Sequence, residues 1–183
     1  MCLQRIFSLS PAAAVLVTLP LAPVVLASAA PAMAQQAYVL VFEGWQRTAY
    51  SNGIVAYECV SRGCPANARV SYRRQPHRPV LEMAQFEAHH QRLSREAPAS
   101  SQGRVSEAKA SGFAERAVEG VRVLTLRRDV TWTDGVQTAA IDALLIGPDA
   151  SFSVVSDADD PADAQADFAQ FLPRLIDLVL QTR

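Results

Sequence analysis

The sequence has few of the side chains that carry most enzyme chemistry. Among its 183 residues there are three histidines, two of them adjacent, and three cysteines, one of them at position 2. It contains no Gly-x-Ser-x-Gly elbow, no His-Glu-x-x-His pair and no glycine-rich phosphate loop. A catalytic triad built from distant positions would have to draw on these few histidines. The sequence therefore predicts a protein that is not an enzyme and that needs no cofactor.

The sequence also lacks an excess of positive charge. Its 17 lysines and arginines face 18 aspartates and glutamates, and the formal net charge is −1. Nucleic-acid-binding domains usually carry a strongly basic face, so nucleic acid is not an expected partner. Only one of the basic residues is a lysine, Lys109. This preference for arginine is typical of the base composition of a bacterial genome and does not by itself indicate recognition.

What the sequence does have is a long apolar beginning. A single charge, Arg5, precedes an apolar run that ends in the small-residue site Ala32-Met33-Ala34. This pattern is typical of a secretory signal peptide, and we expect cleavage near Ala34. Residues 1–34 would then be the signal peptide and residues 35–183 a single globular domain, periplasmic or secreted, that meets the membrane only through export. A retained membrane anchor is the alternative, but four prolines interrupt the run.

The first half of the predicted domain favours strands and then one helix. Three segments are rich in β-branched and aromatic residues and predict strands, at residues 37–45, 53–60 and 68–74. The period then changes, and residues 78–96 predict an amphipathic helix with Phe86 and His90 on its apolar face. The polar segment after this helix, residues 97–103, has no periodicity and predicts a mobile loop.

The second half favours four antiparallel strands and a final helix. Turn residues at 119–120, 133–135 and 147–149 separate segments of alternating or apolar pattern. The last helix is the strongest periodic signal in the chain, with Asp160 as the expected N-cap and Pro161 in the first helical position. The predicted fold class is α+β, an antiparallel β-sheet packed by two helices in the order β-β-β-α-β-β-β-β-α.

The two cysteines of the predicted domain, Cys59 and Cys64, have four residues between them. In an oxidising compartment this spacing favours a disulfide bond. A redox-active pair typically has two intervening residues at the start of a helix, whereas here a strand-like segment and a turn with Gly63 and Pro65 flank the cysteines. A redox role and a metal site remain alternatives to the structural disulfide.

The densest positive segment follows the cysteines and contains Arg69, Arg73, Arg74 and Arg78. On a strand, Arg69 and Arg73 share one face and Arg74 takes the other. We interpret the four arginines as candidate partner-binding residues that would suit an acidic surface. The alternative is a solvated strand edge, where charge discourages unwanted strand pairing.

The three histidines, His77, His89 and His90, are the candidate metal ligands. Adjacent residues on a helix point about 100° apart, so His89 and His90 do not converge on one compact site. Glu87 and His90 form a Glu-x-x-His pair, but carboxylate-bridged metal centres need two such helices and further glutamates. No metal site is therefore predicted.

Five aspartates gather near the start of the last helix and raise the question of calcium. They are Asp157, Asp159, Asp160, Asp163 and Asp167. The central glycine and terminal glutamate of an EF-hand loop are absent, and acidic residues are favourable near the positive end of a helix dipole. We interpret these aspartates as helix-capping residues.

The C-terminal third resembles a known group of exported domains. The residues that carry the resemblance are Gly120-Val121-Arg122-Val123, the hairpin to Leu145-Ile146-Gly147, and the segment SFSVVSDADDPADAQADFAQFLPRLIDLVL. In this region, residues 121–180, the chain resembles PsbP/DcrB-like exported α/β domains, and residues 86–93 match more loosely. The resemblance implies an accessory or assembly factor that binds a partner protein or, in some members, small ligands or ions. It assigns a role to no individual residue.

Taken together, the sequence predicts an exported, non-catalytic accessory or binding protein that acts through protein–protein contact. The partner's identity is not predicted. One alternative is a periplasmic module for a small ligand or a metal, using His77, His89 or His90. The other is an enzyme, either a thiol-disulfide factor acting through Cys59 and Cys64 or a hydrolase without a recognised motif.

Overall fold

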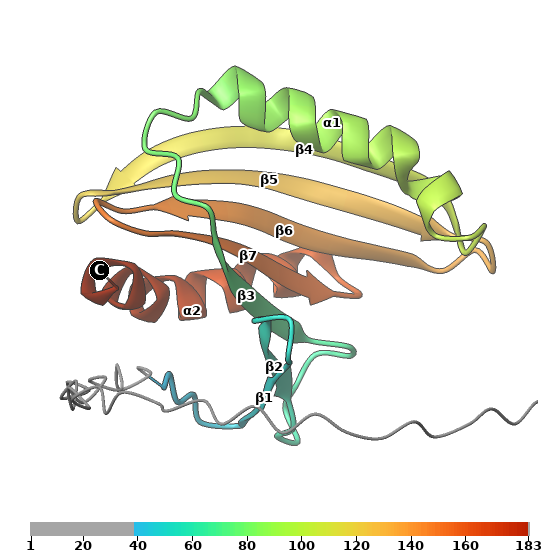
Figure 1. Cartoon of the computed structure of the whole chain (residues 1–183). Coiled ribbons are helices and arrows are strands. Elements are labelled where there is room, and N and C mark those ends of the chain that lie inside the picture. Colours follow the sequence, from blue (N-terminus) through green and yellow to red (C-terminus); the bar gives the residue numbers. More distant parts are fainter. Residues whose placement is uncertain (1–38, 183) are drawn as a thin grey trace, which may run out of the picture. The chain divides into compact units, whose positions relative to one another are not determined.

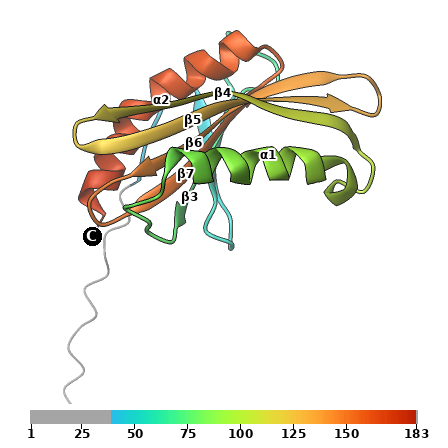
Figure 2. The ribbon, with the colours of Figure 1, turned by 90° about the horizontal axis from the view of Figure 1, so that it is seen from above.

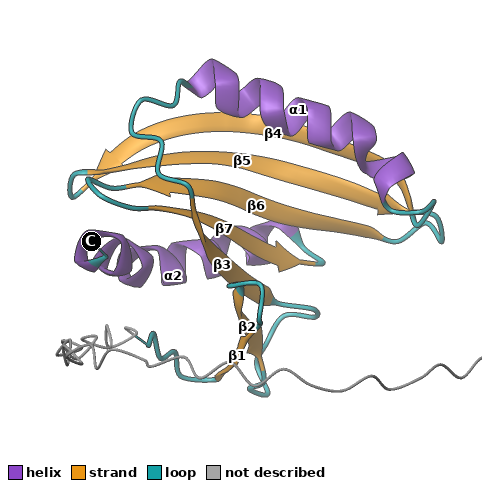
Figure 3. Ribbon diagram, in the orientation of Figure 1, coloured by secondary structure: helices purple, strands orange, loops and turns teal. Residues whose placement is uncertain are grey.

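Nine elements make up residues 39–182, the part of the chain that this computed structural model describes (Figures 1 and 3). The strands are β1 Trp45–Ala49, β2 Val55–Cys59, β3 Arg69–Gln75, β4 Val105–Val118, β5 Val121–Trp132, β6 Gln137–Ile146 and β7 Ser151–Ala158. The helices are α1 Met83–Ser100 and α2 Pro161–Gln181. The predicted α+β class and the predicted element order are both confirmed. The predicted signal peptide lies outside the described residues.

The seven strands form one antiparallel sheet in the order β1-β2-β3-β7-β6-β5-β4. Consecutive strands pair with each other, except that β3 and β4 are separated along the chain by α1, and β3 pairs instead with β7, the last strand of the chain. The N-terminal hairpins therefore extend the sheet beyond β7. At the tip of the β4–β5 hairpin, Glu119 and Gly120 both have positive φ, as a two-residue hairpin turn requires.

Helix α2 covers one face of the sheet and forms the main core with it. Its buried side chains pack on inward-facing residues of β3, β6 and β7, including Val70, Leu145 and Val154. The predicted cap is present, because the Asp160 carboxylate accepts a 2.7 Å hydrogen bond from the backbone N–H of Ala162. Alternate positions on each strand point away from α2, so the two faces of the sheet carry different residues.

Helix α1 lies on the opposite face, over β4 and β5 (Figures 1 and 2). Its Phe86 packs in a small separate cluster with Leu124, Leu126 and Ile146. Neither helix of residues 39–182 is long and apolar enough to cross a membrane.

The first predicted strand is wrong in its position. Residues 39–44 of the predicted segment 37–45 are not extended in the sheet, and β1 begins only at Trp45. The apolar side chains before Trp45 fill the core instead: Leu40 is buried, its carbonyl oxygen accepts a 2.9 Å hydrogen bond from the Tyr57 hydroxyl, and Phe42 stacks on Phe171. Apolar residues that pack across the end of a sheet have the same composition as a strand.

The predicted loop at residues 97–103 is also wrong in part. Helix α1 continues through Pro98 to Ser100, and it ends in a hydrogen-bonded turn. The N–H of Ser101 donates to the carbonyl of Ala97, and the N–H of Gly103 donates to that of Pro98. The proline lies so close to the helix end that its missing N–H costs one terminal hydrogen bond and does not interrupt the helix.

Candidate functional site

The face of the sheet opposite α2 is only partly covered. Helix α1 lies along β4, and β7 and β3 lie farther from it across the sheet (Figure 1). We call this surface the open face. It consists of Arg69, Ser71, Arg73 and Gln75 from β3, paired in register with Asp157, Val155, Ser153 and Ser151 from β7. Arg69 and Arg73 are exposed on this face, Ser151 is buried, and the other residues are partly exposed. A mostly polar, partly exposed sheet face of this kind suits recognition better than core formation.

The four predicted partner-binding arginines are all exposed, but they do not form one plane. Arg69 and Arg73 point to the open face, Arg74 points to the α2 side, and Arg78 lies in the connection to α1. In the register, Arg69 lies between Glu58 and Asp157, whereas Arg73 lies opposite Ser153. Arg73 is therefore free of a neighbouring carboxylate within the sheet.

Hydrogen bonds order the end of the open face near Arg73. The Gln75 side-chain amide lies 2.7 Å from the Ser153 hydroxyl oxygen, and His77 Nδ1 lies 3.0 Å from the Ser151 hydroxyl oxygen. These contacts join β3 and the segment after it to β7. They hold the backbone at the arginine-rich end of β3 in place beside β7.

The three histidines are not brought together. His77 follows β3, and His89 lies exposed on α1, where its Nδ1 is 3.3 Å from Arg92. His90 turns toward the sheet, with Nδ1 4.0 Å from the Asp142 carboxylate. Within residues 39–182 no three histidine, cysteine or acidic side chains lie close enough to hold a metal ion. The metal-binding alternative receives no support from this arrangement.

A partly buried ion pair lies beside His90, and the sequence did not predict it. Arg128 of β5 donates to both oxygens of Asp142 of β6, at 2.8 and 3.0 Å. Burial disfavours the charged form of Arg128 and by itself would lower its pKa. The interaction with Asp142 is stronger, so the pKa of the guanidinium is raised. Burial lowers the pKa of His90 and outweighs the attraction of Asp142. A signal was present in the sequence, since Asp142 is the only charged residue of the strand QTAAIDALLI.

Next to this ion pair, at one end of the open face, lies an open hollow of about 840 Å³. Its floor follows one row of the sheet, in which the register places Glu58, Arg69, Asp157, Ala140 and Arg128 side by side across five strands. The small side chain of Ala140 leaves space between Asp157 and Arg128. The hollow is a concave feature of the open face and a candidate binding site.

The walls of the hollow come from two places. Trp132 at the end of β5 forms one side, and its indole N–H donates to the Thr138 hydroxyl at 3.1 Å. The other side is the loop between β2 and β3, with Cys59, Asn67 and the neighbouring Asp159. Asn67 donates to both oxygens of Asp159, at 2.9 and 3.1 Å.

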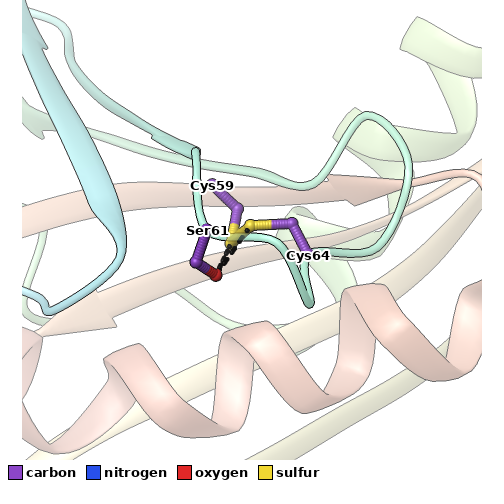
Figure 4. The surroundings of a disulfide bond; sticks show 3 residues. All are labelled: Cys59, Ser61 and Cys64. Carbon is purple, nitrogen blue, oxygen red and sulfur yellow. Dashed lines mark hydrogen bonds between the residues drawn. A yellow bond between two sulfur atoms is a disulfide. The ribbon is translucent and has the colours of Figure 1, made fainter.

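The predicted disulfide joins Cys59 to Cys64 and closes this loop (Figure 4). The Ser61 hydroxyl lies inside the ring, 3.2 Å from the sulfur of Cys64. The loop also sits tightly against Gly44, because a Cβ there would lie 3.2 Å from Ser61 Cβ. The disulfide therefore fixes one wall of the hollow.

No family model matches the chain, and no curated protein matches it. Solved structures with a related arrangement exist at low identity. A protein of unknown function from Pseudomonas aeruginosa is 12% identical, with a TM-score of 0.48, covering 76% of this chain and 99% of that one. The cyanobacterial PsbP from Synechocystis is 15% identical, with a TM-score of 0.42, covering 76% of this chain and 91% of that one.

A third structure, a STAR-related lipid transfer protein from Xanthomonas axonopodis, is 13% identical with a TM-score of 0.33, covering 75% of this chain and 94% of that one. The predicted resemblance to PsbP-like domains is thus met by structural similarity to a PsbP. These similarities concern the fold, and they assign no function to the chain.

Proposed function

We propose that this chain is an exported, non-catalytic binding protein that docks an acidic segment of a partner protein. The docking surface is the arginine-rich end of the open face, around Arg73 and Arg78, with Arg74 at its margin. The observation that carries the proposal is the partial cover of the sheet, which leaves charged and hydroxyl side chains of β3 and β7 outside both helices.

Charge supports an acidic partner. The ion pairs found among residues 39–182 use Arg122, Arg127, Arg128 and Arg174, and none of them uses the arginines of β3 or Arg78. Exposed guanidinium groups that are not paired with an internal carboxylate can form bidentate hydrogen bonds with the carboxylates of a partner. They also steer an oppositely charged partner toward the surface and make binding sensitive to salt.

The geometry favours a protein partner over a substrate at this end of the face. The charges are spread along a strand and the segment after it, and Arg74 points to a different side from Arg73. An extended acidic segment that passes over the strand can meet several of these groups in turn, whereas a small molecule would reach only one or two.

The test is affinity capture from native periplasmic and whole-cell extracts with the full chain as bait. The double variant Arg73→Glu/Arg74→Glu should lose the partner that the unchanged chain retains, because it replaces two cations with two anions. Cross-linking should then place an acidic peptide of the captured protein against β3, and retention should fall as salt is raised.

The control is Arg92→Glu/Arg95→Glu, which makes the same charge change at two exposed positions of α1. This variant should retain the partner. The proposal fails if neither the unchanged chain nor the variants retain a protein, or if both double variants lose it equally.

A further inference from the structure

The hollow beside the disulfide loop contains a carboxylate without a partner. Asp157 lines it, and burial raises the pKa of this carboxyl group; Asp142 adds to the increase, whereas Arg128 and Arg69 act against it. None of the ion pairs found among residues 39–182 includes Asp157. A largely buried carboxylate that no donor contacts is costly to keep unless something else supplies the positive charge.

Two arginines lie in the same row as Asp157: Arg69 is paired with it on β3, and Arg128 lies beyond Ala140 on β5. Arg128 gives two hydrogen bonds to Asp142, which balance part of its charge. The charged groups that line the hollow are three anions, Glu58, Asp157 and Asp159, and two cations, Arg69 and Arg128. The anions outnumber the cations by one, and this excess favours a cationic guest.

The indole of Trp132 lines the hollow, and its hydrogen bond to Thr138 restrains the ring. The face of an indole ring attracts ammonium and guanidinium groups, more strongly where water is partly excluded. Between the carboxylate and the indole lies a floor of small side chains, Ala140 and Thr138, which leaves room for an alkyl chain.

We propose that this hollow binds an organic cation, a primary ammonium or guanidinium group on an alkyl chain, held between the Asp157 carboxylate and the Trp132 indole. The volume, about 840 Å³, lies within the range of small-molecule sites. The site does not include Arg73, Arg74 or Arg78. The test of cation binding is therefore independent of the test of docking an acidic partner.

The same cationic group can come from two sources. It can belong to a free amine, or it can be the side chain of a lysine or arginine on another protein. Cadaverine and agmatine represent the free amines, and Nα-acetyl-lysine amide represents a lysine side chain within a protein.

Isothermal titration of the domain with these three probes tests the site. At least one cation should bind, and the probe that binds more tightly identifies the source. Asp157→Asn should weaken that binding by about tenfold or more, because it removes a charge-assisted contact. Trp132→Phe should weaken it less, because a smaller aromatic face remains.

The matched control is Asp149→Asn, which removes one negative charge from an exposed turn and should leave the affinity unchanged. Hexanoate, an anion of similar length, should not bind. The proposal is overturned if no cationic probe binds at millimolar concentration, if hexanoate binds as well as cadaverine, or if Asp157→Asn binds as tightly as the unchanged chain.

Asp157→Asn is expected to fold, which keeps the test decisive. The raised pKa means that the ionised side chain opposes folding at neutral pH, so a neutral amide of the same shape should not lower stability there. A thermal transition at or above that of the unchanged chain is the expected check, and Trp132→Phe then serves only as the second variant.

Discussion

The two helices are similar in length but make very different contributions to the fold. Helix α2 buries nine of its residues, whereas α1 buries only Phe86 and Ser94. Along α2, apolar side chains recur every three or four residues, while the corresponding faces of α1 carry histidine, serine and arginine. Helix α2 is therefore part of the core, whereas α1 covers the other face of the sheet with only two buried side chains.

Polar contacts compensate in part for the small apolar area under α1. Arg122 of β5 donates to the carbonyl oxygens of Pro79 and Leu81, just before the helix, and pairs with Glu115 of β4. At the helix start, Glu82 and Gln85 form a capping box. Such contacts fix the beginning of α1 in place but supply little hydrophobic free energy, so α1 should be the less stable of the two helices.

The largest effect is expected in the core under α2. Phe171→Ala should lower the free energy of unfolding by about 3–5 kcal/mol, because the fully buried ring packs against Phe42, Trp45 and Tyr57. Urea unfolding measures the loss, and hydrogen exchange should speed up across the whole sheet. A loss confined to α2, with the sheet still protected, would contradict the view that this helix and the sheet form one unit.

A smaller effect is expected under α1. Phe86→Ala should cost about 2 kcal/mol, below the usual range for this change, because the ring belongs to a small cluster with partly exposed rims. Hydrogen exchange should accelerate in α1 and β4 and stay slow in β6 and β7. If exchange accelerates equally in all of them, α1 is not the separate cover that the comparison describes.

The smallest effect concerns the pH dependence of α1. The pKa of His90 in the folded chain lies below its ordinary value of about 6.5. The folded chain therefore favours the neutral imidazole, and this contribution to stability is present above about pH 6.5 and is lost as the pH falls below that value. His90→Gln removes this dependence. The unchanged chain should therefore lose more stability than His90→Gln between about pH 7.5 and about pH 5.5 in urea titrations.

The groups that face His90 set the conditions for this comparison. Asp142 and Arg128 face it from the sheet, and His89 is its neighbour on the helix. His89→Gln is the matched control, because its exposed ring should contribute little. Equal losses in the unchanged chain and in His90→Gln would show that burial of the imidazole does not affect the stability of α1.

Local patterns predicted most of the fold. Helix α2, with its cap at Asp160, and the hairpins from β4 to β7 follow from periodicity and turn residues, which act over short distances along the chain. The first strand and the end of α1 did not follow, because tertiary contacts decide them. Leu40 and Phe42 have the composition of strand residues, and only their contacts with Tyr57 and Phe171 show that they pack in the core outside the sheet.

The candidate site was harder to predict than the fold. The disulfide followed from the spacing of the cysteines, their flanking residues and the expected export, and the positions of Arg69 and Arg73 on one face followed from strand periodicity. The hollow depends on a row that crosses five strands, and no local pattern brings Glu58, Asp157 and Arg128 together before the register is known. Asp157 was interpreted as part of a capping group, but it lies on β7 and lines the hollow.

Strand β4 has a consequence for how the chain behaves among its own copies. It is the outermost strand on its side of the sheet, fourteen residues long, and its pairing with β5 is interrupted by a bulge between Ser111 and Ala114, where Gly112 has a positive φ. A bulge bends the outer row of backbone donors and acceptors, so a second chain cannot continue the ladder past it in register. The long edge is thereby kept from acting as a template for aggregation during folding.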